Sequence, residues 1–72
     1  MSDENESKKW WYEDGQLKQI VSYKNAIRNG KSNSWHINGE KKFEGKYVDN
    51  LKTGLCIFYN DKGVIHTKAE YL

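Results

Sequence analysis

The sequence contains no proline, one cysteine and no long apolar run. Without proline, no position is forced to leave a β-ladder hydrogen bond unmade. A single cysteine, Cys56, excludes an intramolecular disulfide and a multi-cysteine zinc site, and it favours a reducing, cytoplasmic setting. No segment approaches the ~18 apolar residues of a membrane helix, so we expect no membrane span. The polar residues 1–9 contain no hydrophobic segment of the kind that directs export.

What the chain does contain is aromatic residues. Hydrophobic residues make up 36% of its 72 positions, but they include three Trp, five Tyr and two Phe. Each aromatic side chain buries on the order of 150–250 Å², so a few of them can build a thin core. The length allows one small domain.

Charge is distributed unevenly along the chain. Asp3, Glu4 and Glu6 lie within the first six positions, and we expect a disordered acidic tail at 1–7 ahead of a single domain at 8–72. The remaining 66 residues hold twelve basic and seven acidic side chains, and the two signs alternate. This pattern favours a mixed solvated surface over a phosphate-binding one, which normally shows a stronger basic excess.

A repeat of 24 residues runs through the chain. Four series share this period: Gly15, Gly39 and Gly63; Tyr23, Tyr47 and Tyr71; Trp11, Trp35 and Tyr59; Gly30 and Gly54. We therefore expect three repeats, at about 8–30, 31–54 and 55–72.

Each repeat has the residues of a β-hairpin. Asp14-Gly15 and Asn38-Gly39 predict type I′ turns, and residues 60–63 predict a longer turn that ends in a left-handed glycine. Residues 25–30 and 49–54 are expected to be looser connections. The expected fold class is all-β, a six-stranded antiparallel meander of three hairpins with strands at about 8–13, 16–24, 31–37, 40–48, 54–60 and 64–71.

Alternation along the second strand of each repeat separates two faces. One parity is expected to face the core: Leu17, Gln19, Val21 and Tyr23; Lys41, Phe43, Gly45 and Tyr47; Ile65, Thr67, Ala69 and Tyr71. The opposite parity is expected to face water: Lys18, Ile20, Ser22 and Lys24; Lys42, Glu44, Lys46 and Val48; His66, Lys68 and Glu70.

The segment Phe43-Glu44-Gly45-Lys46-Tyr47, followed by Gly54 and Gly63, resembles the MORN repeat. Residues 11–18 and 59–63 resemble the bacterial MORN variant, which is often assigned to the antitoxin component of toxin–antitoxin pairs. The resemblance covers residues 10–72, although Gln19 and Thr67 replace the first aromatic residue in the outer repeats. It implies a single twisted sheet of stacked hairpins, with partner binding as the common use.

The chain shows no grouping of catalytic residues. His36 and His66 occupy non-equivalent positions, and no Ser-His-Asp or Cys-His-Asp set accompanies them. Cys56 lies in the most apolar strand, where a small buried residue is the usual role. We therefore expect no enzyme, no cofactor and no metal site.

The surplus aromatic and apolar residues are the candidates for partner binding. Exposed Trp and Tyr are frequent in protein interfaces, which points to Trp10, Trp11, Tyr12, Trp35, Ile57 and Phe58. The favoured function is a small protein-binding module of the antitoxin, immunity-protein or phage-inhibitor type. One alternative is a nucleic-acid-binding module that uses Lys18, Lys24, Lys42 and Lys46. Another is self-assembly, as a homodimer through an edge strand or through the apolar strand at 55–59.

Overall fold

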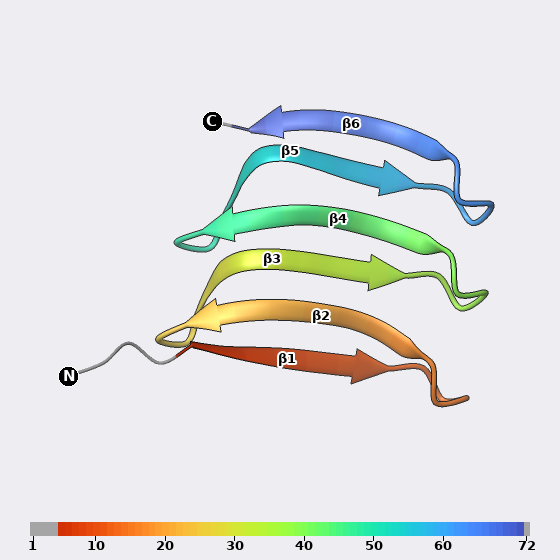
Figure 1. Cartoon of the computed structure of the whole chain (residues 1–72), viewed down its shortest axis with the longest axis horizontal. Helices are drawn as coiled ribbons and strands as arrows, with labels where there is room; N and C mark the ends of the chain where they lie inside the picture. Colours follow the sequence, from red (N-terminus) through yellow and green to blue (C-terminus); the bar gives the residue numbers. More distant parts are fainter. Residues whose placement is uncertain (1–4, 72) are drawn as a thin grey trace.

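Six antiparallel strands make up most of residues 5–71, the part of the chain that the computed structural model describes. Their order in the sheet is their order in the sequence (Figure 1), which confirms the all-β meander. The strands are β1 (Asn5–Trp11), β2 (Leu17–Lys24), β3 (Ile27–Trp35), β4 (Lys41–Val48), β5 (Leu51–Tyr59) and β6 (Ile65–Tyr71). Over residues 5–71 no helix has the length and hydropathy of a membrane span.

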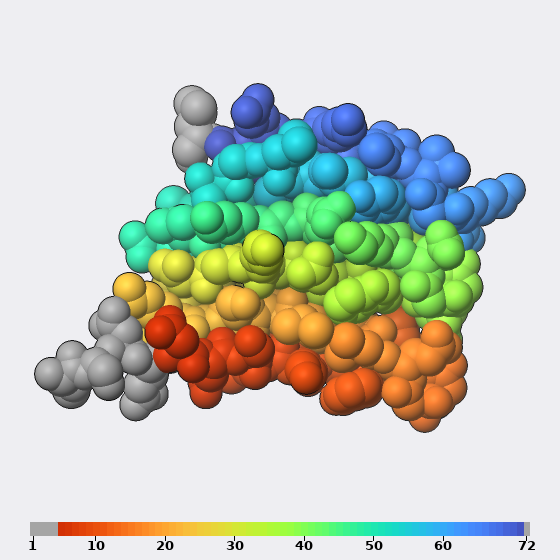
Figure 2. Space-filling view, viewed as in Figure 1, coloured from red at the N-terminus to blue at the C-terminus, as the bar shows by residue number. Residues whose placement is uncertain are grey.

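The sheet is a single layer. It measures 44 × 31 × 11 Å, and Figure 2 shows the strands as parallel bands with no second layer on the face in view. Globular domains usually pack two layers around a core. Here, among the described residues, Val21 and Cys56 are the only buried hydrophobic side chains, and Ser32 is buried with them. The expected burial of Cys56 is confirmed.

The long turns lie together at one end of the sheet, on the right in Figure 1. In the first, the amide of Gly15 donates to the Tyr12 carbonyl at 3.0 Å, and the amide of Tyr12 donates to the Gln16 carbonyl at 2.8 Å. Gly15 has φ +91°, and Gly39 and Gly63 have φ +91° and +80°. This is the longer turn that ends in a left-handed glycine. The sequence predicted it for the third repeat, and it is present in all three.

The type I′ turns lie at the opposite end of the sheet. Asn25 and Ala26 both have positive φ (52° and 66°), as do Asp49 and Asn50 (50° and 69°). The prediction of type I′ turns at Asp14-Gly15 and Asn38-Gly39 was therefore wrong. A left-handed glycine serves both turn types, so the dipeptide alone does not distinguish them.

The predicted six-residue connections at 25–30 and 49–54 were also wrong. Two-residue turns replace them, and β3 and β5 begin directly at Ile27 and Leu51. Gly30 and Gly54 lie within these strands, with φ +110° and +68°, where the pairing register with the preceding strand shifts. A β-bulge with a left-handed residue favours glycine, which explains their spacing without a turn.

Bulges near the start of β2, β4 and β6 exchange side chains between the faces. Trp35 pairs with Lys41 although Ser34 pairs with Phe43, so the register skips Lys42. The ammonium of Lys41 then lies 3.0 Å from the Glu44 carboxylate, a contact that regular alternation would prevent. Leu17, Lys41 and Ile65 therefore leave the face on which the sequence placed them.

The other residues of the predicted core parity do share one face, but Lys18 and Lys42, which the sequence placed on the opposite face, line a hollow together with Gln19 and Ser34 of that same face. What we call the aromatic face carries Val21, Tyr23, Phe43, Tyr47, Cys56, Phe58 and Tyr71. Across its middle, Val21 pairs with Ser32, Ser32 with Gly45, and Cys56 with Ala69. What we call the mixed face carries Ile20, Trp35, Glu44, Leu55, Ile57 and Tyr59.

The first strand begins earlier than the sequence predicted. Asn5, Glu6 and Ser7 belong to β1 and pair with Lys24, Tyr23 and Ser22, so the predicted tail at 1–7 does not extend through them. Residues 1–4 of that predicted tail lie outside the described residues.

Candidate interaction surface

Each hairpin presents one tyrosine beneath a cation on the aromatic face. The Lys8 ammonium lies 5.0 Å from the ring centre of Tyr23. The Arg28 guanidinium lies 4.6 Å from that of Tyr47, and the Lys52 ammonium 5.6 Å from that of Tyr71. A cation in this range is attracted by the negative face of the ring. The aromatic face therefore combines flat apolar surface with positive charge.

The fold positions the second and third of these pairs by the same means. Tyr47 lies opposite Gly30 on β3 and Tyr71 opposite Gly54 on β5, so on that side no cross-strand side chain competes with the ring. On its other side, Tyr47 pairs with Lys52 of β5. The cation, Arg28 or Lys52, is the second residue of the strand that follows each type I′ turn. Arg28 is also held by Asn50: Nε donates to Oδ1 at 3.3 Å and Nη2 to the carbonyl at 3.2 Å. The guanidinium is thus oriented within the isolated chain.

The most aromatic part of this face is where the second hairpin meets the third. Phe43 and Phe58 are cross-strand partners whose ring centres lie 4.9 Å apart at an angle of 50°. The Lys52 ammonium lies 5.9 Å and 5.5 Å from these two rings, in addition to Tyr71. Three rings therefore surround one ammonium at the surface.

Positive charge prevails on the aromatic face. Lys18 and Lys42 line a hollow together with Tyr12, Gln19 and Ser34, near the long turns, and the Lys18 ammonium lies 5.6 Å from the Tyr12 ring. Within the strands of residues 5–71, Glu6 is the only acidic residue on this face. An acidic partner would therefore meet a field of complementary sign.

The mixed face is held by a polar cluster. The Tyr59 hydroxyl donates to Glu44 Oε1 at 2.5 Å, and the Lys41 ammonium donates to Oε2 at 3.0 Å. These bonds, the one from Tyr59 first, hold the pKa of the Glu44 carboxyl below its ordinary value, and the bond to Glu44 raises the pKa of Tyr59. A hollow beside this cluster is lined by Lys31, Asn33, Glu44, Lys46, Leu55 and Ile57.

The six predicted partner-binding residues do not form one patch. Trp10 and Phe58 share the aromatic face, but β1 and β5 are separated by three strands. Trp11, Trp35 and Ile57 belong to the mixed face. Tyr12 lies in the first long turn and donates its hydroxyl to the Trp35 carbonyl at 2.6 Å. Trp10 and Trp11 are both exposed, by 40% and 58%, on opposite faces.

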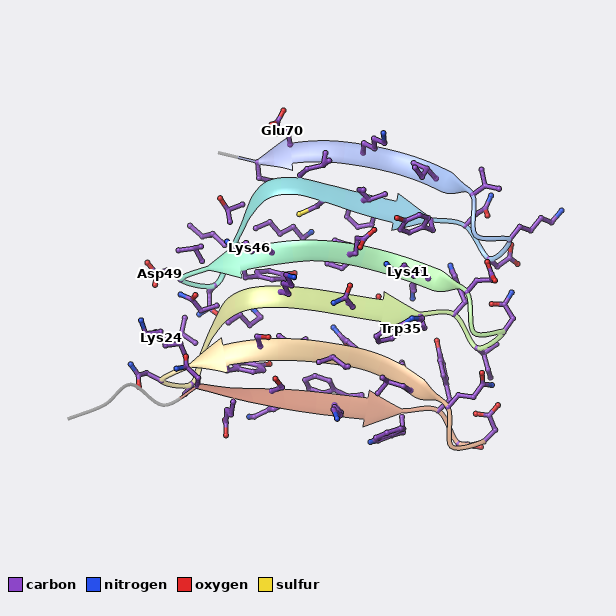
Figure 3. All side chains as sticks on the ribbon, viewed as in Figure 1. Lys24, Trp35, Lys41, Lys46, Asp49 and Glu70 are labelled. Atoms are coloured by element: carbon purple, nitrogen blue, oxygen red, sulfur yellow. The ribbon has the colours of Figure 1, made fainter. Side chains whose placement is uncertain are left out.

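The four lysines of the nucleic-acid alternative are also divided. Lys18 and Lys42 flank the hollow at the long turns. Lys24 and Lys46 lie on the mixed face toward the short turns. Figure 3 shows Lys24 and Asp49 at that end of the sheet, and Trp35 and Lys41 toward the other. The sequence grouped the four by strand alternation, which the bulges interrupt.

The histidines and Cys56 take structural positions. His36 Nε2 lies 3.0 Å from the Tyr59 carbonyl, and His66 Nδ1 lies 2.8 Å from the Thr67 hydroxyl. The Cys56 thiol is fully buried against Gly45. Within the described part of the chain, no three His, Cys, Asp or Glu side chains gather as a metal site.

Sequence reasoning overlooked the tyrosines as surface residues. Tyr23, Tyr47 and Tyr71 were assigned to the core because a hairpin face normally packs against a second layer. The signal was nevertheless present, because Arg28 and Lys52 recur with the same period of 24 as the tyrosines.

A comparison with known protein families matches residues 7–25 to the MORN repeat variant. The match spans most of β1, the first long turn and β2, and it supports a relationship to MORN repeats. No curated protein and no solved structure matches the chain.

Proposed function

We propose that this chain is a protein-binding module without enzymatic activity, and that its aromatic face is the interface. The antitoxin or inhibitor role fits such a module, because a small sheet that covers a partner's working surface acts by occupancy alone. A cytoplasmic setting accords with its single cysteine.

The observation that carries the proposal is the missing second layer. A sheet buries one face in a core because apolar surface is stabilised by about 25 cal/mol per Å² removed from water. Here Phe43, Phe58 and three tyrosines on one face are only partly buried. A protein partner would supply the covering layer, and Tyr, Trp and Arg are the residues that most often carry binding energy at such surfaces.

A matched pair of variants tests the choice of face. Tyr47→Ser with Tyr71→Ser alters the aromatic face. Leu51→Ser with Leu55→Ser alters side chains that are 70% and 53% exposed and pair outside the aromatic face. Each tagged variant is used for affinity capture from extracts of the source cells, and circular dichroism confirms the sheet.

We expect the tyrosine variant to lose its partner by about tenfold or more, because interface hot spots contribute about 2 kcal/mol each. The leucine variant should retain it. Loss with the leucine variant alone would assign binding to the other face and overturn the proposal.

A second candidate is the binding of single-stranded nucleic acid. The specific observation in its favour is that the Lys18 ammonium lies over the Tyr12 ring and that Lys42 lines the same hollow, a combination of charge and aromatic surface on which bases stack. Titration with a labelled oligothymidylate at low salt tests it. Binding that weakens steeply with salt and is lost in Lys18→Gln with Lys42→Gln would favour this candidate. No binding at low salt would remove it.

A further inference from the structure

The three cation–tyrosine pairs form a row that crosses the strands. Lys8 with Tyr23 lies on β1 and β2, Arg28 with Tyr47 on β3 and β4, and Lys52 with Tyr71 on β5 and β6. The pairs therefore recur every second strand of the sheet, whose strand order is shown in Figure 1. Because neighbouring strands lie about 4.8 Å apart, successive pairs are separated by about 9.6 Å across the sheet.

The cations of this row outnumber the acidic residues beside it. Glu6, at one edge, is the only acidic residue on the aromatic face among the described strands. The cations are partly fixed, since Asn50 orients Arg28 and three rings surround Lys52. A guanidinium has five N–H donors and can still bind a carboxylate while two of them contact Asn50.

The spacing selects the conformation of a bound acidic chain. A polyproline II helix has three residues per turn and a rise of 3.1 Å, so every third side chain points the same way at intervals of about 9.3 Å. This is close to the two-strand step of the sheet, which is about 9.6 Å. Side chains on one face of a β-strand repeat at about 6.8 Å, and those at i and i+7 of an α-helix repeat at about 10.5 Å. Both spacings differ more from the spacing of the cation–tyrosine pairs than that of the polyproline II helix does.

We propose that the aromatic face binds an acidic, proline-rich segment of a partner protein. The segment lies across the strands as a polyproline II helix and places one carboxylate on each cation. Its intervening prolines pack on Tyr47, Tyr71 and the pair Phe43 and Phe58, since aromatic grooves suit the preformed polyproline helix. This inference rests on the proposed function and adds the chemistry of the partner.

A synthetic peptide of Glu-Pro-Pro repeats is the probe. The comparison peptide has the same composition, with its glutamates in one block and its prolines in another. Binding to the full chain is measured by NMR titration of backbone amides at low salt. We expect the repeat peptide to bind about tenfold more tightly than the block peptide and to lose affinity as salt screens the charges. Its shifts should map to β-strand residues around Tyr23, Tyr47 and Tyr71.

Two substitutions that remove the same charge test the site. Arg28→Gln should weaken the repeat peptide by about fivefold or more, which matches a charge-assisted contact of about 1 kcal/mol. Lys46→Gln, on the mixed face, should leave its affinity within about twofold, because a surface charge off the site contributes little. Equal affinity for the two peptides, equal effects of the two substitutions, or tighter binding of oligothymidylate would each overturn the inference.

The proposed function can fail separately. If the aromatic-face variant Tyr47→Ser with Tyr71→Ser loses its partner from extracts while the two peptides bind alike, the module is confirmed and the polyproline occupant is wrong. If neither the capture nor the peptide depends on the aromatic face, both proposals are wrong.

Discussion

Gly45 lies directly against the thiol of Cys56: a Cβ atom at Gly45 would lie 2.7 Å from Cys56 Sγ and 2.7 Å from Phe43 Cζ. The first and third repeats accept Val21 and Ala69 at the equivalent position, so the second repeat requires glycine because of its neighbours. Gly45→Ala should lower the free energy of unfolding by about 1–3 kcal/mol through overpacking. Urea denaturation followed by tryptophan fluorescence measures this.

The control for Gly45 is the same substitution in a Cys56→Ala background. Removing the thiol relieves one of the two close contacts, so the cost of Gly45→Ala should fall by a measurable coupling energy. Independent, additive effects would show that the thiol and Gly45 are not in contact.

The two type I′ turns should respond oppositely to glycine. Ala26 has φ +66°, a left-handed conformation in which a Cβ atom crowds the backbone. Glycine has no Cβ, so Ala26→Gly should stabilise the protein by about 0.5–1 kcal/mol. Asn50 has φ +69°, but its Oδ1 accepts a bond from the Arg28 amide at 2.9 Å. Asn50→Gly should therefore destabilise by about 1 kcal/mol. Midpoints of urea unfolding that shift in the same direction would contradict this contrast.

The hydroxyl of Tyr12 connects the first hairpin to the second through the Trp35 carbonyl. Tyr12→Phe keeps the ring beside Lys18 and removes only this bond, so it should cost about 0.5–1.5 kcal/mol. Tyr23→Phe, whose ring lies under Lys8, is the matched control and should change the unfolding midpoint little. Equal midpoints for both variants would mean that the turn-to-turn bond does not contribute.

Glu44 should make the stability depend on pH below neutrality. Its pKa is lowered from 4.5 by the bonds from Tyr59 and Lys41, so its contribution is present above 4.5 and is lost as pH falls through the folded value. Glu44→Gln should therefore flatten the decline in the urea midpoint between pH 7 and pH 3. The effect should be modest, because the side chain is 34% exposed and solvent screens the pair.

The exposed Glu70 on β6, labelled in Figure 3, provides the control for that pH series. Glu70→Gln removes one carboxylate and should leave the wild-type pH dependence in place. If Glu44→Gln and Glu70→Gln give superimposable curves, the Tyr59–Glu44 bond is not formed in solution.

The sequence predicted the six-stranded meander correctly because the same hairpin signals recur in each of the three repeats. The 24-residue period is sufficient to predict three hairpins. The side-chain alternation along β2, which puts Val21 and Tyr23 on one face, is sufficient to predict which residues share that face. They are not sufficient for the turns: Asp14-Gly15 fits two turn types, and the choice depends on how the flanking strands pair.

The site was predicted only in part, for two physical reasons. Bulges of one residue move Lys41 and its equivalents to the other face. No residue type in β4 indicates that a bulge is present. The tyrosines were read as core because burial depends on whether a second layer exists, which alternation along one strand cannot reveal. Trp10 and Phe58 were identified as surface aromatics, but their separation by three strands follows only from the sheet order.

The aromatic face is open in the isolated chain and is therefore ready for a partner. Paramagnetic relaxation by a soluble reagent, read from the ring signals of labelled tyrosine, tests this most directly. The ring signals of Tyr23, Tyr47 and Tyr71 should relax strongly, and the relaxation rate should not change with the concentration of the chain. Protected rings, or protection that grows with concentration, would show that another layer or a second copy already covers the face.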